Sequence, residues 1–107
     1  MEFALTVITL VADLPRNEAG KIIGNQLLRA GTSIGANYRE ARRARSKAEF
    51  IAKIGDCLKE ADETCYWLEL ITRSKISSSS QLPSVHGENR ELIAILVSTL
   101  NTAKSRK

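Results

Sequence analysis

The sequence contains few residues that interrupt helices or crosslink chains. Its 107 residues include two prolines, two cysteines, one tryptophan, two tyrosines and two phenylalanines. Scarcity of proline and of aromatic residues favours helices, because proline breaks helices and aromatic residues are typical of strands. At this length we expect one domain, residues 1–107, with a modest hydrophobic core.

Long hydrophobic runs are also missing. No stretch approaches the roughly 20 apolar residues that a helix needs to cross a bilayer. The first residues do not combine a basic segment, an apolar segment and a small-residue cleavage site. We therefore expect no membrane association and a cytoplasmic location.

Metal-binding and catalytic residues are sparse. The only histidine, His86, is expected in the linker before the last helix. No Glu-x-x-His, Cys-x-x-Cys or His-Glu-x-x-His spacing occurs, so neither a di-iron nor a zinc site is predicted. Glu60 and Glu63 share one helix face and are interpreted as solvated surface. We expect no metal, no cofactor and no enzymatic activity.

The two cysteines are not expected to pair. Cys57 and Cys65 lie eight residues apart in a helical pattern, which separates them by roughly 12 Å of rise. A disulfide cannot span that distance within one chain. Both thiols are therefore expected to be reduced and packed.

The first half of the chain shows two segments with apolar residues at helical spacing. One runs from Phe3 to Leu14 and is expected to end before Pro15. The other runs from Ile23 to Ala41, with Asn17 as its expected N-terminal cap. The second segment contains Gly31 and Gly35, which indicate either a closely packed neighbour or simple tolerance. Asn37 lies on its apolar seam, either as a buried amide that sets the register or as an edge residue.

The second half shows two further helical segments. Ser46 and Glu49 match a capping box, so a third helix should begin at Ser46. A serine-rich linker at about 74–84 follows, and Ser84 is the expected cap of the last helix. The sequence thus predicts an all-α, antiparallel up-down four-helix bundle with two long central helices. The first helix appears too short to cover them, so some apolar surface should need a partner subunit.

Charge is unevenly distributed along this predicted bundle. The formal net charge is +4, and the segment 39–53 carries six basic and two acidic residues. If the first and last helices begin and finish at the same end, Glu2, Lys104, Arg106 and Lys107 join it, which gives nine positive and three negative groups. Basic residues in a last helical turn also complement the helix dipole, so a structural role is the alternative. Arg39, Arg42 and Arg43 share one face, as phosphate-contacting side chains would.

The stretch "QLLRAGTSIGANYREARRARSKAEF" at 26–50, followed by "IGDCLKEADETCYWLELI" at 54–71, resembles a known family. This family comprises four-helix bundle proteins encoded in intervening sequences of bacterial 23S ribosomal RNA genes, together with accessory proteins of diversity-generating retroelements. The resemblance implies a homopentamer whose basic surface meets nucleic acid. The positions onto which such contact would be carried are Arg29, Arg39, Arg42, Arg43, Arg45 and Lys47. Many relatives have glycines where Ala41 and Arg43 stand, so the second helix should continue further here.

Taken together, the sequence predicts a non-enzymatic, oligomeric helical bundle that binds RNA or DNA through phosphate contacts at a basic end. The alternative is a protein-binding scaffold or accessory subunit, in which the arginines would bind carboxylates of an acidic partner.

Overall fold

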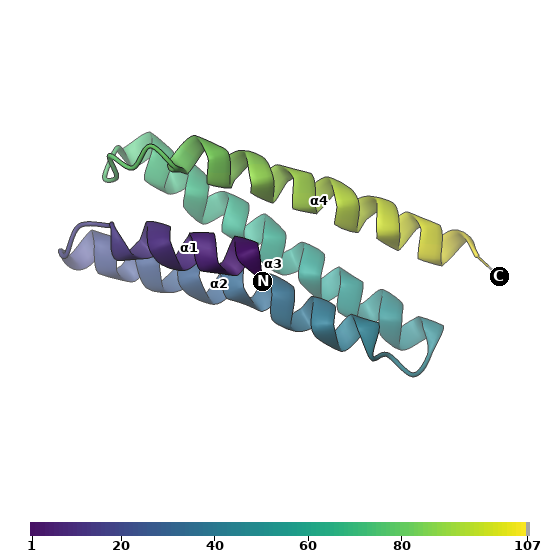
Figure 1. Ribbon diagram of the computed structural model, residues 1–107. Coiled ribbons are helices and arrows are strands. Elements are labelled where there is room, and N and C mark those ends of the chain that lie inside the picture. Colours follow the sequence, from purple (N-terminus) through teal and green to yellow (C-terminus); the bar gives the residue numbers. More distant parts are fainter. Residues whose placement is uncertain (107) are drawn as a thin grey trace.

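The computed structural model describes residues 1–106 and consists there of four helices without strands (Figure 1). They are α1 (Glu2–Ala12), α2 (Glu18–Arg42), α3 (Lys47–Ser74) and α4 (Leu82–Ser105). Consecutive helices run antiparallel and form a bundle that measures 50 × 19 × 19 Å. The predicted all-α fold with a long central pair is confirmed, and α4, with 24 residues, is nearly as long as that pair. None of these helices has the length and apolarity that a bilayer crossing requires.

The starts of α2 and α3 are fixed by local capping, as the sequence predicts. Asn17 Oδ1 accepts a hydrogen bond from the Gly20 amide at 2.9 Å, and Ser46 Oγ accepts one from the Glu49 amide at 3.0 Å. Each bond satisfies one of the amides that lack a partner in a first helical turn. The Glu49 carboxylate accepts from the Arg45 amide at 3.4 Å rather than from that of Ser46, so the capping box is displaced by one residue.

The linker before α4 is shorter than predicted. The helix begins at Leu82, not at Ser84, and has Pro83 in its first turn. Proline is tolerated there because the amide that it lacks would have no helical partner. The expected position of His86 in the linker is therefore wrong, since this residue lies within α4 and is buried.

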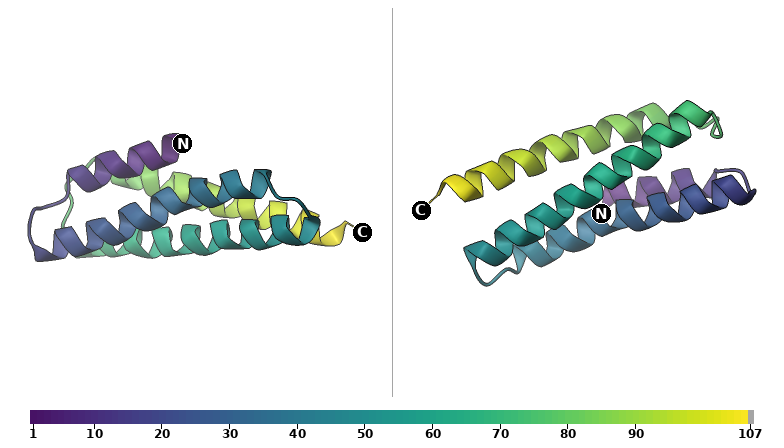
Figure 2. Two further views of the ribbon diagram at one scale, coloured as in Figure 1. Left: turned by 90° about the horizontal axis from the view of Figure 1, so that it is seen from below. Right: turned by 180° about the vertical axis from the view of Figure 1, so that it is seen from behind.

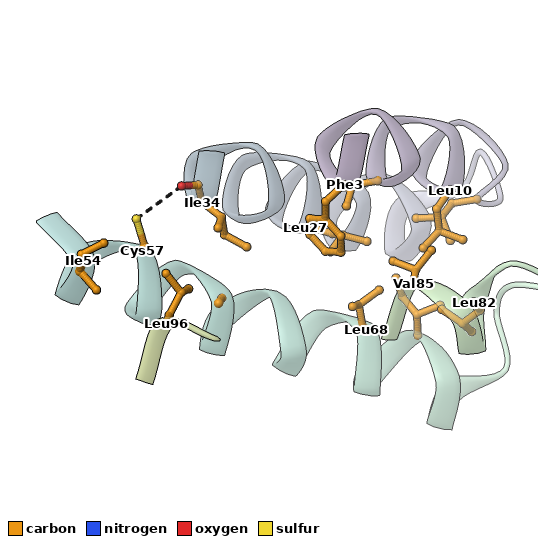
Figure 3. Packing of buried hydrophobic residues seen from close by; sticks show 14 of the residues in the cluster. Phe3, Leu10, Leu27, Ile34, Ile54, Cys57, Leu68, Leu82, Val85 and Leu96 are labelled. Carbon is orange, nitrogen blue, oxygen red and sulfur yellow. Dashed lines mark hydrogen bonds between the residues drawn. The ribbon is translucent and has the colours of Figure 1, made fainter. Parts of the chain in front are cut away.

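A continuous cluster of buried side chains joins the four helices (Figure 3). Helices α2 and α3 pack along their lengths, α4 packs on α3, and α1 packs on α2 and part of α4. Because α1 has 11 residues, it covers only part of the length of the bundle, and its first residue lies near the middle (Figure 2). The expectation that the first helix begins at the α2–α3 turn is thus wrong. The reason is length, since 11 residues of helix span roughly 16 Å.

Two asparagines, Asn37 of α2 and Asn89 of α4, differ in how deeply they are buried. Asn37 is half-buried and donates to the Ser33 carbonyl of its own helix at 3.0 Å, so it is an edge residue and does not set the register. Asn89 of α4 is fully buried and donates to the Ala61 carbonyl of α3 at 3.1 Å. A buried amide that bonds to a neighbouring helix favours one register of the two helices. Asn89 therefore has the role that was considered for Asn37.

The two glycines of the α2 seam also differ. A Cβ atom on Gly31 would lie 3.0 Å from a methyl group of Val7, so α1 approaches α2 closely at this point. A Cβ atom on Gly35, one turn further, would meet nothing within 4 Å. The close neighbour indicated by the sequence is thus present at Gly31 and absent at Gly35.

His86 makes the stability of the fold sensitive to pH. Its imidazole is 8% exposed, and its Nε2 atom lies 3.7 Å from the Cys65 thiol. Burial, helped by Arg90 on the same helix and opposed by Glu69 of α3, lowers the pKa of His86 below its usual 6.5. Because the unfolded chain then takes up this proton first, the free energy of unfolding should fall as the pH drops below about 6.5.

Chemical denaturation between pH 7 and pH 5 measures this effect. The His86→Gln variant should lose part of the pH dependence, because glutamine does not titrate. Superimposable pH profiles for the two proteins would show that His86 does not contribute.

Candidate nucleic-acid interface

One end of the bundle gathers basic side chains from four segments. The last turn of α2, the turn that follows and the start of α3 meet there, and α4 finishes toward the same end (Figures 1 and 2). We call this region the basic end. Its basic residues are Arg39, Arg42, Arg43, Arg45, Lys47, Lys53, Lys104 and Arg106.

The basic end is strongly polarised relative to the rest of the molecule. Its eight basic residues face two acidic ones, Glu40 and Glu49, which leaves a net charge of +6. The remainder of residues 1–106 carries seven basic and ten acidic residues, a net charge of −3. Glu2 belongs to this remainder because α1 begins near the middle of the bundle. Lys107, which was also expected here, lies outside the described residues.

Seven of these eight cations have no partner among the carboxylates of residues 1–106. They are exposed and form no ion pair within 4.0 Å: Arg39, Arg42, Arg43, Arg45, Lys47, Lys104 and Arg106. The first five lie in or beside the α2–α3 turn. Lys53 differs, because its ammonium lies 3.0 Å from Glu40 and 4.0 Å from Asp56. The hydrogen bond to Glu40 raises the pKa of Lys53. Glu40 and Glu49, the two acidic residues of the basic end, therefore leave most of its positive charge uncompensated.

Arg29 has a different environment from the other candidate residues. Its guanidinium forms ion pairs with Glu60, at 3.2 Å, and with Glu63, both of α3. The hydrogen bond to Glu63 is the main reason that the pKa of Arg29 is raised. Glu60 and Glu63 are thus partners of Arg29 rather than merely solvated surface. Arg29 also precedes Arg39 by ten residues, roughly 15 Å of helical rise, so it lies away from the basic end.

The unpaired arginines surround shallow hollows in the surface. Arg39, Arg42 and Arg43 line one of about 280 Å³. Arg43 and Arg45 also line a neighbouring one of about 370 Å³, together with Glu40, Glu49 and Lys53. Three arginines that line one hollow, with no acidic residue among the lining, form a suitable environment for an anion such as phosphate.

A second feature, which sequence reasoning missed, adjoins the basic end. An apolar groove of about 220 Å³ lies where α1 begins, between α2 and α4. It is lined by Met1, Phe3, Ala4, Gly31, Ile34, Gly35, Tyr38, Leu92, Ile95, Leu96 and Thr99. In the sequence, the shortness of the first helix indicates that some apolar surface is left uncovered. The position of the groove, however, depends on where α1 begins along α2, which the sequence does not give.

Comparison with known proteins identifies the relatives of this chain. A solved structure from Bacteroides thetaiotaomicron, described as a protein of unknown function from the S23 ribosomal protein family, is 41% identical. It superposes with a TM-score of 0.85 and covers 92% of both chains. No functionally curated protein matches. The family model for the 23S rRNA-intervening sequence protein matches residues 1–98, and the chain therefore belongs to this family.

Proposed function

We propose that this protein is a non-enzymatic, cytoplasmic homo-oligomer that binds RNA or DNA through its basic end. The observation that carries the proposal is the group of five exposed cations in or beside the α2–α3 turn, which have no carboxylate partner among residues 1–106. Free arginine and lysine side chains on one surface suit the closely spaced charges of a phosphate backbone. Phosphate contacts carry no sequence information, so the expected binding is largely independent of sequence.

Oligomerisation would bring several basic ends together, so that one nucleic acid binds the assembly with higher affinity than it binds a single subunit. Unpartnered apolar side chains support assembly: Leu5 and Ile8 lie one turn apart on α1 and are 56% and 47% exposed, and Ile22 of α2 is 54% exposed. Several exposed large apolar side chains on a small domain are consistent with a surface that a partner covers. The family resemblance favours a pentamer, and a mass measurement in solution tests the subunit count.

The salt dependence of binding tests the proposed function. Five cations that each neutralise a phosphate should give a slope of log K against log salt of up to about −4.5 per subunit on duplex DNA. On single strands the slope should reach about −3.5. Fluorescence anisotropy with labelled RNA and duplex DNA at several salt concentrations measures both slopes. Absence of binding at low salt, with folded protein, would reject the proposal.

A further inference from the structure

The apolar groove beside the basic end lies where α1 begins, next to Gly31 and Gly35 of α2. Over the first part of α2, α1 fills the space above the helix, so that Val7 touches Gly31. One turn further, a Cβ atom on Gly35 would meet nothing within 4 Å, so no side chain of α1 covers this position. The result is an open trough between α2 and α4 whose walls include Tyr38 and Ile95. Both side chains are well exposed, at 47% and 60%, although they are large and apolar for the most part.

The arginine cluster lies next to the groove along α2. Gly31, Gly35, Tyr38 and Arg42 follow one another at intervals of four, three and four residues, so they lie along one face of α2. Arg42 stands one turn beyond Tyr38, roughly 6 Å along the helix axis, and also lines the hollow of the three arginines. The apolar groove and the hollow lined by three arginines are therefore separated by about one helical turn.

The chemistry of the groove matches part of a nucleotide. No charged side chain lines it, which suits the face of a base, whereas the neighbouring arginines suit the phosphates on either side. The Tyr38 ring can stack on a base of any sequence, since every base has a π-face. In a duplex these faces are already stacked on neighbouring bases. Only an unpaired base can therefore enter such a groove.

We propose that the groove is a base-binding subsite that gives the protein a preference for single-stranded nucleic acid. In this arrangement an unpaired base stacks on Tyr38, and Arg39 and Arg42 bind the flanking phosphates. This inference rests on the proposed function and adds to it the class of nucleic acid that is preferred. The charge of the adjacent arginines favours this occupant over an apolar segment of a second subunit, which would bring no anion to them.

The experiment measures the affinity of the protein for an unstructured single-stranded RNA and for a blunt-ended duplex of the same length, both at one salt concentration. The Tyr38→Ala variant should bind the single strand about 5- to 150-fold more weakly, which corresponds to the loss of one stacked base, while its affinity for the duplex stays unchanged. The Tyr38→Phe variant keeps an aromatic ring and should retain the wild-type preference. Tyr66→Ala is the matched control, because Tyr66 of α3 is also exposed but lines neither the groove nor the arginine hollow.

The possible outcomes separate this inference from the proposed function. Equal loss of single-strand and duplex binding in Tyr38→Ala, or no loss of either, would overturn the base subsite and leave phosphate binding intact. A change in subunit number in Tyr38→Ala, without a change in strand preference, would identify the groove as a contact between copies and also overturn it. Failure of the wild type to bind either probe would reject the proposed function itself.

Discussion

Replacing Arg39, Arg42 and Arg43 together by glutamine is expected to weaken nucleic-acid binding by about two to three orders of magnitude near 0.1 M salt. The three guanidinium groups line one hollow and have no carboxylate partner among residues 1–106. Removing three phosphate contacts should also make the slope of log K against log salt shallower by about 2.7 on duplex DNA. The side chains are exposed, so the fold should be retained. Binding isotherms at several salt concentrations, with circular dichroism of the variant, measure both effects.

A matched control removes the same amount of charge from the opposite end of the bundle. Arg16, Lys21 and Lys75 are exposed and lie at or near the α1–α2 connection and the end of α3. Their combined replacement by glutamine lowers the net charge equally but leaves the basic end unchanged. It should therefore reduce affinity far less than the arginine triple variant does. An equal effect of the two triple variants would show that overall charge, and not the basic end, determines binding.

The Gly20→Ala variant is expected to lose about 1–3 kcal/mol of stability, or more. A Cβ atom at this position would lie 2.1 Å from the carbonyl oxygen of Pro15 and 3.3 Å from the capping oxygen of Asn17. The first of these is a backbone atom of the short connection between α1 and α2, so it cannot move aside as a flexible side chain can. The substitution should therefore displace this connection from the first turn of α2. Thermal or denaturant unfolding measures the loss.

Gly55→Ala is the natural comparison for this experiment. Gly55 lies inside α3, and a Cβ atom there would meet nothing within 4 Å. Alanine costs less conformational entropy than glycine in a helix, so this variant should gain about 0.5–1 kcal/mol. The same chemical change thus has opposite expected signs at two positions. If Gly20→Ala were as stable as the wild type, the connection would have to be more adaptable than its geometry indicates.

Features that depend on near neighbours in the sequence, or only on the antiparallel order of consecutive helices, were predictable from the sequence. Asn17 and Ser46 cap their helices as expected, because capping involves side chains and amides only three residues apart. The pairing of Arg29 with the acidic stretch of α3 follows from antiparallel packing of consecutive helices. The clustering of Arg39 to Lys47 was predictable for the same reason, since the α2–α3 turn joins them directly.

Features that depend on how distant helices are rotated and offset were not predictable. Asn89 is buried because α4 turns that face toward Ala61 of α3, and no local pattern distinguishes it from Asn37. The position of α1 along α2 is set by contacts such as Val7 on Gly31, which determine where the apolar groove opens. The burial of His86 depends in the same way on how α4 packs against α3, where its Nε2 atom lies 3.7 Å from the Cys65 thiol.

The uneven distribution of charge along a molecule 50 Å long has a consequence for its motion in solution. With +6 at one end and −3 over the rest, a single subunit has a large permanent electric dipole along its long axis. In the field of a polyanion such a rod experiences a torque as well as an attraction, and it rotates until its positive end leads. Approach and orientation then occur together, before any side chain makes contact.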